Sequence, residues 1–140
     1  MPAPLPDPDF GETRVRTVSL PTTSAAPWLA RQLLGQWCRE WDVPGSVVDE
    51  ATVVVSELVT DCVATGAPVA ALRASLGPDE LELAVSGTAA GLPSGAAEDE
   101  AAVRRMEIMR GIGSSVEVRP GAQGRTVVVA VPLSRAPWNG

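Results

Sequence analysis

The most apolar helical run of the chain lies at residues 47–64, where hydrophobic residues recur at helical spacing. Within it, Glu57 and Asp61 stand four residues apart, so both carboxylates lie on one face, one turn from each other. Two like charges at this spacing destabilise an exposed helix by about a few tenths of a kcal/mol, and more where they are sheltered. The pair therefore indicates either a functional face or a solvated edge of the helix, and the spacing alone favours the solvated edge.

Two further helices are predicted, at residues 28–41 and 101–110. The first has an apolar face and bears three of the four Trp residues of the chain. Core packing explains these Trp residues best, while a partner-binding face stays open because Trp is common at interfaces. We expect Ser24 to cap this helix and Ser46 to cap the helix at 47–64.

Alternation of apolar and polar residues predicts five strands, at residues 13–20, 69–76, 81–86, 116–119 and 125–133. Gly and Pro between the second and third strands, and between the fourth and fifth, indicate hairpins. The sheet should therefore be mostly antiparallel. The last strand is too continuously apolar for a half-exposed position, so we expect it to lie centrally. With three helices on one face, the fold class is α/β (α+β), a two-layer sandwich.

At 140 residues the chain is long enough for one domain with a proper core. We expect residues 1–12 to be a disordered leader, 13–133 to be the single domain and 134–140 to be a loose tail. The connection at 87–100 is rich in Gly, Ala and Ser. A link of this length is typical of a functional loop or lid, and a flexible surface loop is the alternative.

Composition excludes several kinds of chemistry. The chain has no His, no Lys and no Tyr, which rules out a Ser-His-Asp triad, a His metal ligand, a Schiff-base Lys and a P-loop Lys. The net charge of −6 argues against nucleic acid as the main partner. Cys38 and Cys62 lack metal-like spacing and are interpreted as reduced thiols in or near the core. No membrane span and no signal peptide are predicted, so the expected compartment is the cytoplasm.

The order of elements and the run Ser56-Glu57-Leu58-Val59-Thr60 resemble the histidine-kinase-like ATPase fold, also called the Bergerat or GHKL fold. The chain looks most like the small single-domain proteins akin to anti-sigma-factor serine kinases, which are numerous in actinobacteria. The resemblance covers residues 15–133 in order and spacing, and it includes the closing strand that begins Gly124-Arg125-Thr126-Val127.

In that family the helix reads Glu-Leu-Val-Thr-Asn, where Glu acts as general base or orients water and Asn holds Mg²⁺ against the phosphates. The resemblance makes Glu57 the vestigial general base. Asp61 stands at the Asn position and keeps a carboxyl oxygen able to bind Mg²⁺. However, Asp61 adds a negative charge near the phosphates and lacks the amide donor.

The second family motif is an Asp just after the second hairpin strand, which recognises the adenine amino group. Gly87 stands at that position, and glycine offers no side-chain acceptor. Gly91 fits the usual character of the loop that follows, although this match is unspecific.

The third family motif is a Gly-x-Gly-Leu whose backbone N–H groups cradle phosphate at the start of the third helix. The aligned run, residues 102–109, contains no glycine. Arg104 and Arg105 could contact an anion themselves, but the acidic run 98–100 beside them opposes it. Three departures at three separate contacts imply that the fold is kept and the nucleotide groove is vestigial.

These observations imply a regulatory protein that acts by protein–protein binding, as an anti-sigma factor or a co-regulator would, with a degenerate ATP site. No cofactor is then expected. The partner would be a regulatory protein such as a sigma factor or an anti-sigma antagonist, and a homodimer stays open. The alternative is an active, ATP- and Mg²⁺-dependent serine kinase of the anti-sigma type. Binding of an unrelated ligand is a third interpretation.

Overall fold

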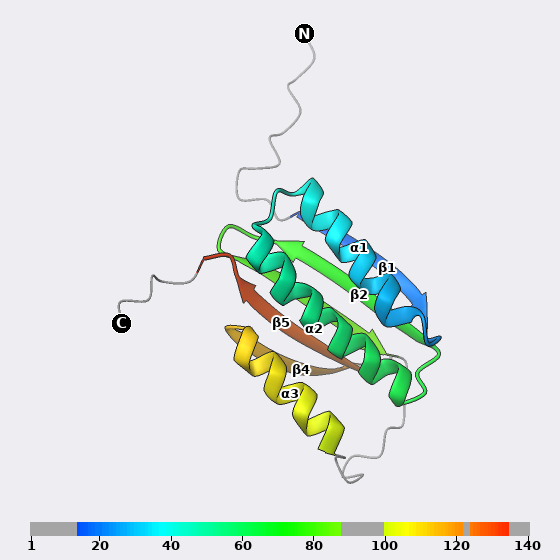
Figure 1. Cartoon of the computed structure of the whole chain (residues 1–140). Coiled ribbons are helices and arrows are strands. Elements are labelled where there is room, and N and C mark those ends of the chain that lie inside the picture. The colour runs from blue at the N-terminus through cyan, green and yellow to red at the C-terminus, as the bar shows by residue number, and fades with distance from the viewer. Residues whose placement is uncertain (1–13, 88–99, 122–123, 135–140) are drawn as a thin grey trace.

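A five-stranded sheet carries three helices on one of its faces in a computed structural model of the chain (Figure 1). The structure describes residues 14–87, 100–121 and 124–134. The strands are β1 (Arg14–Pro21), β2 (Val69–Leu76), β3 (Glu80–Gly87), β4 (Ser115–Gly121) and β5 (Gly124–Pro132). The helices are α1 (Ala26–Glu40), α2 (Gly45–Ala64) and α3 (Glu100–Ile112).

The strand order is β1-β2-β3-β5-β4, and every neighbouring pair is antiparallel. The β2–β3 hairpin closes where the backbone N–H of Gly77 donates to the carbonyl of Glu80 at 3.0 Å. β5 lies between β3 and β4 with partners on both sides, which confirms the expectation that its valine run belongs inside the sheet.

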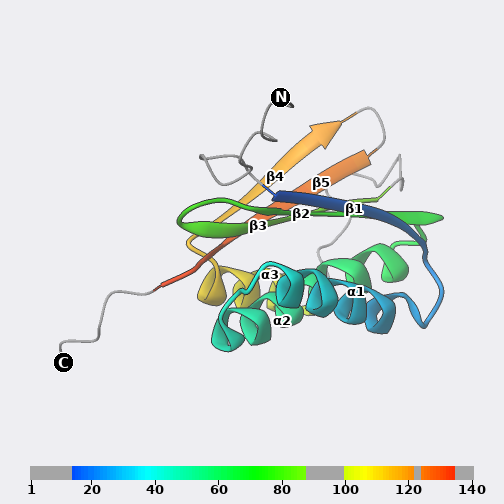
Figure 2. The same cartoon turned by 90° about the horizontal axis from the view of Figure 1, so that it is seen from above.

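All three helices form a single layer, with α2 in the middle between α1 and α3 (Figures 1 and 2). α2 contacts β2, β3 and β5 as well as both neighbouring helices. Its inner face is fully apolar because the buried positions recur at helical spacing; they are Val47, Ala51, Val54, Val55, Leu58, Val59 and Cys62. The expected two-layer sandwich with a mostly antiparallel sheet is thus confirmed.

Both expected serine caps are wrong. α1 follows Ala25 at its N-cap, and the backbone N–H of Ala25 donates to Thr23 Oγ1 at 3.3 Å. α2 already begins at Gly45, because the extended backbone of Pro44 places its carbonyl to accept from the first turn. Ser46 is therefore inside the helix and not at its N-cap.

The tryptophans divide between the core and the surface. Trp37 and Trp41 are each 8% exposed and belong to the core between the helices and the sheet. Trp28, in the first turn of α1, is 54% exposed. Core packing therefore accounts for two of the three tryptophans in this region, and Trp28 stands apart from them.

Several expectations fall on residues outside the described ranges: the leader at 1–12, most of the connection at 87–100, and the tail beyond residue 134. Among the described residues, no helix is both long enough and apolar enough to cross a membrane.

Candidate functional site

α3 packs against α2 and brings together Asp61 and Arg105, two of the residues singled out from the sequence. Nη2 of Arg105 donates to Oδ1 of Asp61 at 2.9 Å. The Arg105 side chain is only 13% exposed, whereas Asp61 is 38% exposed. Arg105, a cation of the chain itself, thus binds the carboxylate that the family resemblance assigns to Mg²⁺.

The guanidinium of Arg105 is not fully satisfied by this contact. Its Nε is buried and has no hydrogen-bond partner among the residues that the structure describes. Leaving a buried donor unpaired costs free energy. The ion pair with Asp61 is therefore the main contact that offsets the cost of burying the Arg105 side chain.

Glu57 lies one turn before Asp61 on α2 and is half-buried. Within the described part of the chain it makes no hydrogen bond and no ion pair. The residue before it, Ser56, accepts a hydrogen bond from Nη1 of Arg31 on α1 at 2.8 Å. The two carboxylates therefore differ: Asp61 is held by an ion pair, and Glu57 keeps an uncommitted carboxylate at the border of the groove.

Gly87 ends β3 against the C-terminal half of α2. A Cβ atom at this glycine would lie 3.3 Å from Sγ of Cys62 and 3.3 Å from Cβ of Ala67. These distances are shorter than ordinary van der Waals contact, so a side chain here requires its neighbours to move. The space beside Gly87 is therefore already filled by the chain itself.

The thiol of Cys62 contributes packing and not reactivity. Burial, reinforced by the neighbouring charge of Asp61, raises the pKa of Cys62 to about 11. Burial likewise raises the pKa of Cys38 to about 11, opposed by the charge of Arg39. A neutral buried thiol behaves as a small hydrophobic side chain, so Cys62 forms an apolar wall beside Gly87.

The position of α3, and hence of Arg105, depends on Gly113. A Cβ atom at this glycine would lie 2.7 Å from Cγ1 of Val129 and 3.0 Å from the carbonyl oxygen of Ala130. The backbone N–H of Gly113 donates to the carbonyl of Met109, whose buried side chain belongs to the core. This close approach of the end of α3 to β5 is open only to glycine.

These observations test whether Mg²⁺ and a nucleotide fit the groove. The Asp61 carboxylate, which the resemblance assigns to Mg²⁺, is paired with Arg105, and a side chain at Gly87 would crowd Cys62 and Ala67. No cluster of three or more acidic or Cys side chains suited to a metal ion occurs among the described residues. The arrangement of these side chains therefore does not fit Mg²⁺ with a bound nucleotide.

Two sequence-predicted residues stay apart from this arrangement. Arg104 is exposed on α3, and Gly91 lies outside the described residues. Sequence reasoning had proposed that Arg104 and Arg105 could contact an anion, and it missed that Asp61 is the anion that Arg105 contacts. It also missed Cys62 and Ala67 as the neighbours of Gly87, although Cys62 follows Asp61 directly in the sequence.

Neither a scan of the chain against protein-family models nor a search against curated proteins found a match. The functional interpretation therefore depends on the geometry of the groove and on the sequence motifs.

Proposed function

We propose that this chain is a regulatory protein of the histidine-kinase-like ATPase fold that acts by binding another protein and does not use ATP. The Arg105–Asp61 ion pair is the observation that carries the proposal. It supports a groove in which a side chain of the protein replaces the metal ion that nucleotide binding in such a site requires.

The filled space beside Gly87 supports the same conclusion independently. A site built around a side-chain hydrogen bond discriminates strongly against its loss. Gly87 cannot supply that bond, and a side chain in its place would require Cys62 and Ala67 to move. Loss of two separate contacts weakens ligand binding much more than loss of either alone.

The surface available for a protein partner includes the start of α1. Trp28 is a large aromatic side chain that is 54% exposed. Aromatic anchors of this kind are enriched among the residues that dominate protein–protein binding energies. We therefore assign Trp28 to the partner-binding surface, and a sigma factor or an anti-sigma antagonist is the proposed class of partner.

Co-purification with the tagged full chain tests this assignment. Trp28→Ala should lower the affinity for the captured and then purified partner by about ten-fold or more, since truncating a central aromatic anchor typically costs over 2 kcal/mol. Gln32→Ala changes an exposed residue one turn further along α1 and serves as the matched control. Its affinity should equal that of the parent chain, both with and without Mg·ATP.

The same experiment separates the proposal from an active serine kinase. If the purified partner becomes phosphorylated on serine, or is captured only when Mg·ATP is present, the kinase interpretation is correct. If Trp28→Ala and Gln32→Ala bind the partner equally well, the assignment of Trp28 is wrong.

A further inference from the structure

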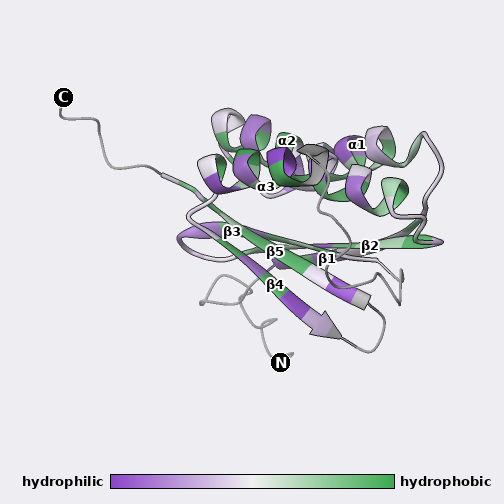
Figure 3. Cartoon of the chain, turned by 90° about the horizontal axis from the view of Figure 1, so that it is seen from below, coloured by the Kyte–Doolittle hydropathy of each residue, from purple (hydrophilic) through white to green (hydrophobic). Residues whose placement is uncertain are grey.

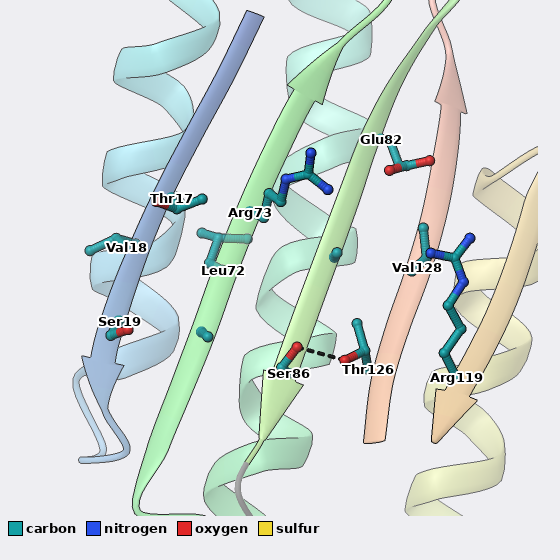
Figure 4. A pocket seen from close by; sticks show the side chains of 12 residues that line it. Thr17, Val18, Ser19, Leu72, Arg73, Glu82, Ser86, Arg119, Thr126 and Val128 are labelled. Atoms are coloured by element: carbon teal, nitrogen blue, oxygen red, sulfur yellow. Dashed lines mark hydrogen bonds between the residues drawn. The ribbon is translucent and has the colours of Figure 1, made fainter. Parts of the chain in front are cut away.

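One face of the sheet lies away from the three helices (Figure 3), and it carries a cavity of about 530 Å³ (Figure 4). This volume falls within the range of about 300–1,000 Å³ typical of small-molecule sites. Its floor is formed by short side chains, including Ala71 and Ala84, and by Val128. Figure 2 shows the helices together on the other face of the sheet, so the cavity is separate from the Arg105–Asp61 contact and from the proposed function.

The register of the strands explains the hollow. Arg73 on β2 pairs with Ala84 on β3, which in turn pairs with Val128 on β5. The residues of a strand alternate between its two faces, so these three share the open face. Small residues on two adjacent strands leave a depression, and longer side chains from β2, β3 and β4 surround it.

One cation of the cavity is free to attract an anion. Arg73, Arg119 and Glu82 line the cavity, and Arg119 is paired with Glu117, so Arg73 is the lining cation without an ion pair among the described residues. Figure 4 shows the two guanidinium groups extending over the sheet from β2 and β4. A local positive charge on an acidic protein concentrates anions at that place.

Arg73 is the available anchor. It is exposed on an interior strand of the sheet and makes no hydrogen bond or ion pair with the other described residues. Arg119 is partly engaged, because its Nε and Nη2 donate to the Glu117 carboxylate at 2.6 Å and 3.2 Å. A planar guanidinium without a partner suits bidentate binding of a carboxylate.

Hydroxyl groups in the cavity add a neutral donor. Ser86 Oγ on β3 and Thr126 Oγ1 on β5 lie 2.7 Å apart and share one hydrogen bond (Figure 4). Two hydroxyl groups carry two protons, so one remains to be donated elsewhere. The carboxylate of Glu82, by contrast, repels a ligand that carries a second negative charge. The ligand should therefore carry one negative charge.

We propose that this cavity binds a small organic monoanion, with its carboxylate on Arg73 and its apolar body on the alanine floor between β2 and β3. The Ser86–Thr126 hydroxyl pair lines the end of the cavity away from the Arg73 guanidinium (Figure 4). The Arg73 guanidinium, which has no ion pair among the described residues, and the volume of the cavity both match such a ligand.

Titration of the ¹⁵N-labelled full chain with 2-naphthoate tests the proposal, and 2-naphthamide is the neutral control of the same shape. We expect naphthoate to shift the backbone amide resonances of Ser86 and Thr126, and naphthamide to bind at least about ten-fold more weakly. Arg73→Gln should weaken naphthoate binding about ten-fold, whereas Arg39→Gln, an exposed cation on α1, should leave it unchanged. Glu82→Gln should tighten it roughly three-fold.

The variants' own spectra report whether each one folds, and the opposite effects of Arg73→Gln and Glu82→Gln cannot arise from misfolding of both. Equal binding of naphthoate and naphthamide, or no shift of these amides at millimolar naphthoate, would overturn the proposal. Sedimentation is measured in parallel. If the chain self-associates, and if Ser86 and Thr126 shift with protein concentration alone, a second copy covers this face and the proposal is wrong.

Discussion

Arg105 on α3 holds Asp61 on α2 through a contact of 2.9 Å between Nη2 and Oδ1. The two residues are 44 positions apart in the sequence, and the contact joins α3 to α2 at the carboxylate that the family resemblance assigns to Mg²⁺. The ion pair therefore links the packing of the helical layer to the proposed loss of ATP binding.

The strength of this pair can be measured by a double-mutant cycle of Asp61→Asn and Arg105→Gln. Because Asp61 is 38% exposed, solvent screens the interaction, and we expect a coupling free energy of about 0.5–1 kcal/mol. The coupling should fall in about 1 M NaCl, where the screening length is only about 3 Å. Arg16 and Glu40 form a more exposed ion pair and serve as the control. Zero coupling at low salt would show that the pair does not hold the groove closed.

The close approach of α3 to β5 predicts opposite effects at two neighbouring glycines. A Cβ at Gly113 would lie 2.7 Å from Val129, so Gly113→Ala should lower the free energy of unfolding by about 1–3 kcal/mol. A Cβ at Gly111 meets nothing within 4 Å, and Gly111 is helical, so Gly111→Ala should raise stability by up to about 1 kcal/mol. Urea unfolding measures both. Equal effects of the two substitutions would contradict the packing of α3.

The space beside Gly87 predicts coupling with Cys62. Gly87→Ala should lower stability by about 1 kcal/mol, because its Cβ would lie 3.3 Å from the Cys62 sulfur. In a Cys62→Ala background the sulfur is removed, and the same substitution should cost less. Gly87→Asp alone should not restore ATP binding, since Arg105 would still occupy Asp61. Thermal unfolding with and without Mg·ATP measures both effects. A stabilisation of Gly87→Asp by ATP would contradict this explanation.

The two buried thiols predict a loss of stability in alkali. Burial raises the pKa of Cys38 and Cys62 from 9.0 to about 11 in the folded chain. Above pH 9 the unfolded chain therefore loses thiol protons that the folded chain keeps, so stability is full below pH 9 and falls as the pH rises to 11. The chain has no Lys and no Tyr, so no other side chain titrates in this window.

Urea unfolding between pH 8 and 12 measures this slope, with the window set by the two thiol pKa values. Cys62→Ala should reduce the slope by about half, and the double variant with Cys38→Ala should abolish it. The slope of stability against pH is measured for each variant separately, so the packing cost of each substitution does not affect the result. An unchanged slope in the double variant would contradict the assignment.

The sequence predicted the layers of the fold because its apolar periodicity and its turn residues agree with each other. The valine run of β5 indicated an interior strand, and the hairpin at Gly77 followed from local turn chemistry. The caps at Ser24 and Ser46 failed because several polar or extended residues near each helix start can begin the first turn. In the structure Ala25 is the N-cap of α1, and Pro44 is the N-cap of α2.

The groove was predictable only in part. The motif at residues 56–60 and the residue that follows it identified Glu57 and Asp61. The partner of Asp61, however, depends on how α3 is rotated against α2. That rotation is determined by tertiary packing at Gly113 and Met109, which no local pattern encodes. The open-face cavity was missed for a related reason: Arg73, Glu82 and Arg119 come together only through the register of four strands.

Isothermal titration of the full chain with ATP, in the presence of Mg²⁺, tests the central claim most directly. Loss of two or three contacts worth about 1.5–3 kcal/mol each moves even a micromolar site to millimolar or weaker. We therefore expect no measurable heat of binding up to about 1 mM ATP. A dissociation constant in the micromolar range or below, lost in Asp61→Ala, would contradict the proposal that this groove is closed to nucleotides.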